Sequence, residues 1–206
     1  TYDGRPFRSA VTELEQANDS QRENGMTRIS VGGTANITDN MSFEADYTYS
    51  RNETHLNEVG GTIEAYNFWV GSLNYGTYTP TSFNDIYASS SWSKRDNLRG
   101  VFNYNQDFGN HSFEVLTGAE REKYRYEFQS SEKDALLDAN NRPAIDLATG
   151  DQYVGGAKSH YATLGFFGRV NYDYDNKYLL QVNGRYDGSS RFPSHQRWGF
   201  FPSVSV

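Results

Sequence analysis

The chain has 206 residues, no Cys, a net charge of −7 and 16% aromatic residues. The absence of Cys excludes a disulfide framework and a thiolate metal site, and the negative charge argues against nucleic acid as the main partner. The mean hydropathy is −0.80, and no apolar run approaches the roughly 18–20 residues that a membrane helix needs.

Residues 1–26 show no strand pattern and are expected to form a loop, with a short helical turn in SAVTELEQAN. The opening TYDGRPFRSA lacks the basic start and the apolar core of a signal peptide. Since the alternating pattern also starts and stops abruptly, we expect the chain to be an internal piece of a longer protein.

Strict alternation begins at residue 28 and predicts two strands joined by a short turn. One face of the first strand carries Ile29, Val31, Gly33, Ala35 and Ile37, and one face of the second carries Met41, Phe43, Ala45, Tyr47 and Tyr49. Directly opposed residues of a hairpin point to the same face. Ile37 opposite Met41 therefore predicts a three-residue loop centred at Asp39.

A long connection follows, and its central part, Thr62–Thr81, is rich in aromatic residues. These are Tyr66, Phe68, Trp69, Tyr75 and Tyr78. Aromatic faces suit stacking against sugars and suit packing against a protein partner equally well. We expect these five residues to contact either substrate or partner.

The next hairpin tests the face rule, because the apolar positions change parity across it. They are even in Leu98, Gly100, Phe102, Tyr104 and Phe108, and odd in Phe113, Val115, Thr117 and Ala119. A two-residue loop at Gly109-Asn110 reconciles the two sets, and Gly in its first position favours a type II′ turn. After Ala119 the aromatic positions become even again at Tyr124, Tyr126 and Phe128. Either a bulge lies near residues 120–123 or the strand leaves the bilayer there, and we favour the second interpretation.

The last hairpin has the clearest alternation. One face carries Leu164, Phe166, Val170, Leu180 and Val182, and the other carries Arg169, Asn171, Gln181 and Arg185. Tyr174 opposite Tyr178 leaves a three-residue turn centred at Asn176. We expect the first face to be convex and to contact lipid, the second to line the lumen, and Tyr174, Tyr178, Trp198 and Phe200 to form interfacial girdles.

Short turns on one side and long connections on the other are typical of outer-membrane barrels. The predicted fold is all-β, an antiparallel up-and-down meander of about seven strands that forms part of the wall of a transmembrane β-barrel, without an internal domain boundary over residues 1–206. Two alternatives remain, a passive porin and a secreted carbohydrate-binding β-sandwich.

Three motifs near the end occur in order: FGRVNY at 167–172 with KYLL at 177–180, R-x-DGSSRF at 185–192, and RWGFFPSV at 197–204. In these motifs the chain resembles the SusC/RagA family of TonB-dependent outer-membrane transporters. The resemblance implies a plugged 22-stranded barrel in the bacterial outer membrane that takes up oligosaccharides or peptides, powered by TonB, with a SusD-like surface lipoprotein as its lid. The plug and most of the barrel would lie outside these residues.

No pattern indicates an enzyme, a cofactor or a metal site. The four His residues are scattered, and Asp173 and Asp175 lack the following Gly and the distal Glu of an EF-hand, which favours a turn. Polar residues of the lumen or rim are expected at Arg169, Asn171, Arg185, Asp187 and Arg191. We expect Arg185, Asp187 and Arg191 to form one charged network, and Gly188-Ser189-Ser190 to form a tight outer loop.

Overall fold

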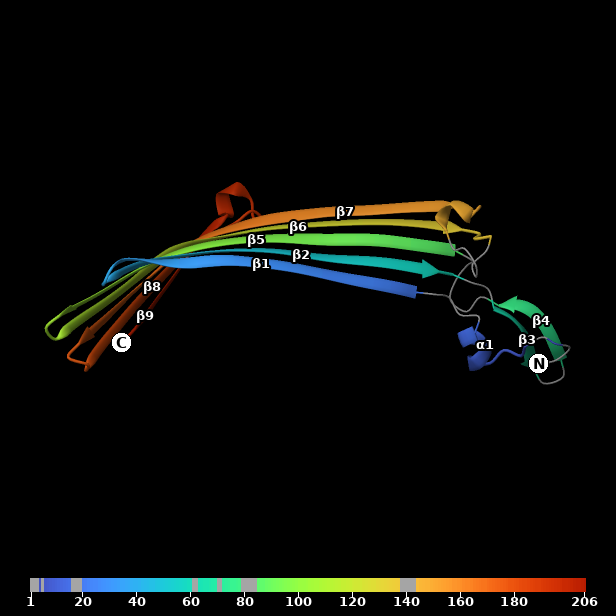
Figure 1. Cartoon of the computed structure of the whole chain (residues 1–206), viewed down its shortest axis with the longest axis horizontal. Helices are drawn as coiled ribbons and strands as arrows, with labels where there is room; N and C mark the ends of the chain where they lie inside the picture. Colours follow the sequence, from blue (N-terminus) through green and yellow to red (C-terminus); the bar gives the residue numbers. More distant parts are fainter. Residues whose placement is uncertain are drawn as a thin grey trace. The chain divides into compact units, whose positions relative to one another are not determined.

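The computed structural model describes residues 4, 6–15, 20–60, 63–69, 72–78, 85–137 and 144–206, with the backbone alone for residues 13–15, 63–64, 67–69 and 72–78. Strands dominate these residues (Figure 1). The elements are α1 (Ala10–Glu15), β1 (Ser20–Thr38), β2 (Met41–Val59), β3 (Ile63–Trp69), β4 (Ser72–Tyr78), β5 (Asp85–Phe108), β6 (His111–Asp134), η1 (Ile145–Leu147), β7 (Gln152–Tyr174), β8 (Tyr178–Ser189), η2 (Ser194–Gln196) and β9 (Trp198–Ser205). No helix among the described residues is long and apolar enough to cross a membrane.

The main sheet contains seven strands in the order β1-β2-β5-β6-β7-β8-β9, so each strand pairs with the next one of the sheet along the chain (Figure 1). This arrangement confirms the predicted antiparallel meander. Strands β3 and β4 form a separate two-stranded sheet within the Thr62–Thr81 segment. The segment was expected to be a loop, because its apolar residues do not alternate strictly.

The three predicted hairpin turns are all present. Gly109 has a φ of +59° while Asn110 has a negative one, which fits a type II′ turn. Tyr174 pairs with Tyr178, and Asp175 and Asn176 in the turn between them adopt positive φ values of 57° and 54°. Asp173 Oδ1 accepts a hydrogen bond of 2.8 Å from the Asn176 backbone N–H, which stabilises this turn.

Backbone hydrogen bonds place these turns at the same end of the strands. The Asp175 N–H donates to the Asn110 carbonyl oxygen at 2.8 Å, and the Asn105 N–H donates to the Asn40 carbonyl oxygen at 2.9 Å. Each turn therefore lies beside the end of the neighbouring hairpin, as the barrel interpretation requires.

The chain divides into two compact units, one formed by residues 1–25, 53–92 and 127–157 and the other by residues 26–52, 93–126 and 158–206. In the second unit, alternation separates two faces. We call "apolar face" the side that carries Leu98, Phe102, Val115, Phe166, Val170, Leu180 and Val182. We call "polar face" the side that carries Arg99, Glu120, Arg169, Asn171 and Arg185.

The apolar face does not form a dry core in the part of the chain that the structure describes. Phe166 is 47% exposed, and Val170 and Val182 are each 41% exposed. A β-sandwich would bury such residues against a second sheet. The exposure of this face does not fit the sandwich alternative and fits a wall whose apolar side contacts another apolar phase.

Three strands are longer than expected. β5 and β6 each have 24 residues and β7 has 23, whereas about 9–11 residues of a tilted strand cross a bilayer. The long connections are therefore shorter than the alternating apolar residues indicated, since β2 continues to Val59 and β7 begins at Gln152.

Strand β6 shows no bulge at residues 120–123. On one side of this segment Asn171 Nδ2 contacts Glu114 Oε2 at 3.0 Å, and on the other side the rings of Tyr161 and Tyr124 stack at 5.0 Å. Both contacts correspond to the same pairing register between β6 and β7. Tyr124 and Tyr126 consequently lie on the polar face. The interpretation that the strand leaves the bilayer at this segment stays a prediction.

The first unit has a small core of its own, in which Ile86, Leu136 and Ala148 are buried and Val59 packs against them. An isolated antiparallel bridge joins Leu136 to Ala148. At the edge of this core, burial raises the pKa of Asp85 above its ordinary value, and the nearby charges of Asp134 and Glu58 raise it further.

Candidate functional site

The polar face carries an ion network centred on Arg185. Arg185 and Asp187 lie two residues apart on β8 and so point the same way, and Arg185 Nε donates to both carboxylate oxygens of Asp187 at 2.8 Å. Arg185 Nη2 also lies 3.7 Å from Glu120 Oε2, and its guanidinium carbon lies 5.7 Å from the centre of the Phe167 ring. Gly165 lies opposite Asp187 on β7, where any Cβ would collide with the Asp187 carboxylate.

Arg191 belongs to a second network rather than to the first. Its guanidinium carbon lies 3.9 Å from the centre of the Tyr161 ring, a cation–π geometry. The Tyr161 hydroxyl donates to Glu122 Oε1 at 2.8 Å, and Glu122 Oε2 lies 3.6 Å from Arg95 Nε. The expectation that Arg191 joins Arg185 and Asp187 was wrong, because Tyr161, which sequence reasoning did not single out, holds Arg191 instead.

Strand β8 is also longer than predicted at this end. Gly188 and Ser189 belong to β8, and the connection to β9 runs over residues 190–197 with η2 inside it. The tight loop expected at Gly188-Ser189-Ser190 was therefore placed too early. The pairing of Gly188 with Trp198 explains the extension, since the indole ring covers the glycine, where a Cβ would lie 2.8 Å from the ring.

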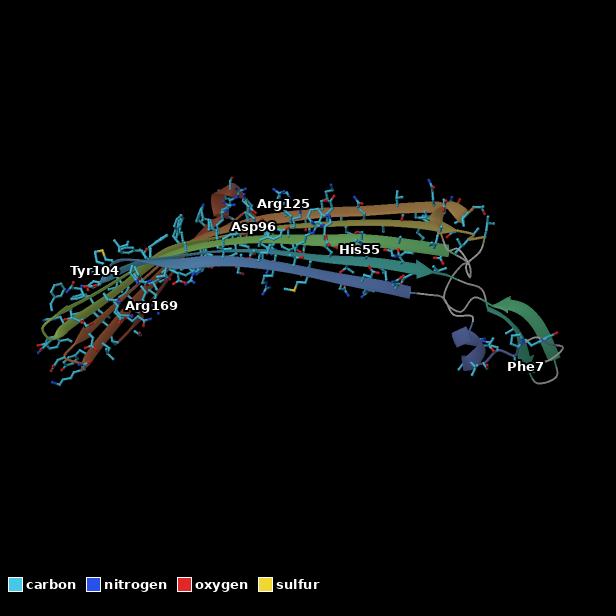
Figure 2. All side chains as sticks on the ribbon, in the orientation of Figure 1. Phe7, His55, Asp96, Tyr104, Arg125 and Arg169 are labelled. Atoms are coloured by element: carbon cyan, nitrogen blue, oxygen red, sulfur yellow. The ribbon has the colours of Figure 1, made fainter. Side chains whose placement is uncertain are left out.

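Arg169 and Asn171 lie on β7, nearer the turns. Arg169 Nε donates to Asn183 Oδ1 at 2.8 Å, and Asn183 Nδ2 donates to Ser203 Oγ at 3.2 Å, so a hydrogen-bonded row crosses β7, β8 and β9 (Arg169 in Figure 2). Asn171 forms its own cross-strand bond to Glu114, described above. Unlike Arg185, Arg169 forms no ion pair with any residue that the structure describes.

A cavity of about 650 Å³ opens on the polar face between these groups. Its lining combines three cations with aromatic rings and small polar groups, which can bind the charged and polar groups of an organic ligand. The lining includes Arg99, Phe167, Arg169, Asn183, Arg185 and Phe201. The structure thus brings together Arg169 and Arg185 of the predicted polar residues, and adds Arg99 and Phe201, which the sequence did not single out.

The aromatic candidates of the Thr62–Thr81 segment lie on the β3–β4 hairpin. Phe68 and Trp69 belong to β3, Tyr75 and Tyr78 belong to β4, and Tyr66 pairs with Tyr75 across the hairpin. The Tyr66 ring lies 6.1 Å from the ring of Phe7, and the Tyr66 N–H donates to the Pro6 carbonyl oxygen at 2.9 Å. The segment before β1 therefore packs on this hairpin, and Tyr66 holds the two together.

Aromatic residues gather at two levels of the apolar face. Near the turns, Tyr174 stacks with Tyr178 at a centroid distance of 6.4 Å. At the other end of β8, Trp198 stacks with Tyr186 at 4.9 Å and with Phe166 at 6.3 Å. Two aromatic levels separated by aliphatic residues are the pattern of membrane girdles.

No catalytic arrangement is evident in the described residues. No group of three or more His, Asp or Glu residues lies close enough there to hold a metal ion. Asp173 and Asp175, the pair considered for Ca²⁺, are engaged in the turn, where Asp175 Oδ2 pairs with Lys177 Nζ at 2.5 Å. What the polar face offers is a set of hydrogen-bonding, charged and aromatic groups for binding.

The chain matches the family model "TonB dependent receptor-like, beta-barrel" over residues 2–206. It is 32% identical over 119 residues to TonB-dependent receptor P26 of Formosa agariphila, covering 53% of this chain and 11% of that protein. It is 31% identical over 107 residues to TonB-dependent receptor SusC of Bacteroides thetaiotaomicron, covering 50% of this chain and 10% of that protein. The chain thus matches about a tenth of the length of these curated relatives.

Among solved structures, the chain is similar to the RagAB peptide importer in its open-open state, with a TM-score of 0.78 and 17% identity over 99% of this chain and 21% of that one. A further structure of the RagAB peptide transporter gives a TM-score of 0.73 at 18% identity, over 99% of this chain and 22% of that one. Fold, face pattern and family model agree, and the chain therefore belongs to the family of TonB-dependent receptor-like β-barrels of the outer membrane.

Proposed function

We propose that this chain is a wall section of a transporter that takes up oligosaccharides or peptides across the outer membrane, powered by TonB and assisted by a SusD-like surface lipoprotein. The match of residues 2–206 to the TonB-dependent receptor family carries this proposal. The similar proteins support it, since one is SusC and the RagAB structures are of a peptide importer. The plug and the segment that contacts TonB would belong to other parts of the protein.

The polar face supports binding of a polar solute inside the barrel. Arg99, Arg169 and Arg185 surround one cavity with Phe167 and Phe201, and guanidinium groups and aromatic rings bind carboxylates, amides and sugar faces. Such groups suit oligosaccharides and peptides alike. The proposal therefore keeps both substrate classes.

Energised uptake is the test that separates this proposal from a passive porin. Cells that carry the full-length gene, with or without TonB, would be given labelled oligosaccharides and labelled peptides, and label reaching the periplasm would be measured. We expect accumulation that requires both the gene and TonB. Accumulation that requires the gene but continues without TonB would favour the porin.

The β3–β4 hairpin is expected to contribute to docking of the lipoprotein or of substrate, because aromatic residues are concentrated there. It can be removed to test this, because surface segments tolerate deletion. The residues on either side of the deleted segment are close together, since the Gly60 N–H donates to the Asp85 carbonyl oxygen at 2.7 Å. A short Gly-Ser linker between these two residues would replace the hairpin. We expect weaker co-purification of the lipoprotein or slower uptake, with normal amounts of protein in the outer membrane.

A second variant keeps the hairpin and replaces Phe68, Trp69, Tyr75 and Tyr78 with Ser. If the aromatic side chains make the contacts, this variant should lose as much as the deletion does. Unchanged uptake and unchanged lipoprotein capture in both variants, at normal abundance, would show that the hairpin has no docking role.

A further inference from the structure

The apolar face changes character along β6. Val115, Thr117 and Ala119 are followed on the same side of the strand by Arg121, Lys123 and Arg125 (Arg125 in Figure 2). The three cations therefore begin where the apolar side chains end. On β6 they lie farther from the short turns than the apolar residues do.

Neighbouring strands repeat this change at the same place. On the polar face Arg95 lies 5.6 Å from the Tyr124 ring, which stacks on Tyr161. The chain neighbours of these residues, Lys94, Arg125 and His160, emerge on the opposite side of β5, β6 and β7 because alternate side chains point to opposite faces. Arg51 on β2 and Lys158 on β7 occupy the same face. We call Arg51, Lys94, Arg121, Lys123, Arg125 and Lys158 the "basic band".

The basic band has little compensating negative charge in its unit. Asp96 lies among the residues of the basic band on the same face. Its Oδ1 accepts a 2.7 Å hydrogen bond from the Tyr47 hydroxyl (Asp96 in Figure 2). The next residues outward on the same side of β2 and β6 are the acidic Glu53 and Glu127. Positive charge is therefore confined to a narrow strip, in a chain whose net charge is −7.

Three cations of the polar face and three of the basic band differ in their partners. On the polar face Arg95, Arg99 and Arg185 each lie within 4.0 Å of a carboxylate oxygen. Arg121, Lys123 and Arg125 are exposed, and within the described ranges none of them forms a hydrogen bond or an ion pair. The band therefore presents at least three cations that are free to bind an external anion.

We propose that the basic band binds the phosphate groups of lipids in the outer leaflet of the membrane. If the apolar face contacts acyl chains, the residues directly beyond it lie at the depth of the headgroups. Arg and Lys can keep their stems on the apolar surface while the charged ends reach phosphate oxygens. Basic clusters at this depth attract anionic lipids. The proposal requires the membrane placement of the apolar face, but it does not depend on which solute is transported.

The test uses the full-length protein in nanodiscs of zwitterionic phosphatidylcholine. Fluorescent diphosphoryl lipid A and the same lipid after removal of its phosphates would be titrated in, at low and high salt. The wild type is expected to prefer the phosphorylated lipid by about tenfold or more, and salt should weaken this preference. The triple variant Arg121→Gln, Lys123→Gln, Arg125→Gln should lose most of it, whereas Lys123→Arg should retain it.

The matched control removes the same charge elsewhere, through Arg22→Gln, Arg28→Gln and Lys177→Gln at exposed positions outside the band. It should bind lipid as the wild type does, and heat-modifiable migration in gels would confirm that every variant is folded. Equal binding of the two lipids by the wild type would overturn the proposal. So would a triple variant that keeps its lipid preference but loses a co-purifying protein, since the band would then serve a protein partner.

Discussion

Replacement of Val182 with Arg is expected to destabilise the folded barrel by roughly 2–4 kcal/mol, the cost of Arg on a lipid face near the bilayer midplane. Val182 pairs with Val170 on β7 and with Val204 on β9. Along β8 it lies midway between Tyr178 and Tyr186, which belong to the two aromatic levels. An arginine there would have the longest path to water in either direction.

Two companion variants make this result specific. Gln181→Arg places the same side chain on the polar face, one residue away, and should cost little. Leu180→Arg keeps the apolar face but lies two residues from Tyr178, so its cost should fall between the other two. Unfolding of the full-length protein in lipid vesicles, followed by denaturant titration, gives the three free energies. Equal costs at Val182 and Gln181 would contradict a lipid-facing wall.

Replacement of Gly118 with Ala is expected to cost about 1–3 kcal/mol, as overpacking of a tight site does. A Cβ on Gly118 would lie 2.6 Å from the Gly100 carbonyl oxygen and 2.6 Å from the nearest atom of the Phe167 ring. The ring also contacts Arg185, whose guanidinium carbon lies 5.7 Å from the ring centre. Neither the backbone oxygen nor the ring can yield without disturbing the polar face.

Gly168→Ala is the control, because Gly168 also lies within a strand that is paired on both sides. The nearest atom to a Cβ there is the Leu116 carbonyl oxygen at 3.6 Å, an ordinary contact. Alanine at such a site should be neutral or stabilise slightly, since glycine loses more backbone freedom on folding. The same denaturant titration applies, and a Gly118→Ala variant as stable as Gly168→Ala would mean that Phe167 does not rest on Gly118.

The short turns could be predicted because each one must return the chain to the same face. Gly109-Asn110 was fixed by the change of parity between Phe108 and Phe113, and Asn176 by the match of Tyr174 to Tyr178. A face rule of this kind depends only on nearby residues. It therefore works from the sequence alone.

The outer parts of the strands could not be predicted in the same way. Tyr124 lies on the polar face against Tyr161, while Arg125 lies on the other side, so alternation continues but its polarity is reversed. The partners of Arg191 and Glu122 come from different strands and depend on register, which the sequence does not state. The β3–β4 hairpin has no strictly alternating pattern, and its contact between Tyr66 and Phe7 joins residues 59 positions apart, which the sequence does not show.

Spin-label accessibility at Val115 and Leu116 tests most directly whether the two faces meet lipid and lumen. Both residues are apolar neighbours on β6, so their chemistry does not distinguish them, but Leu116 lies beside Arg169 at the polar-face cavity. Each would be replaced by Cys, in full-length protein lacking other cysteines, and labelled in outer-membrane lipids. The label at Val115 should be open to oxygen and shielded from a water-soluble nickel chelate, and the label at Leu116 should not show this lipid signature. The same signature at both positions, or its reversal, would contradict the assignment of this chain to a membrane-spanning wall.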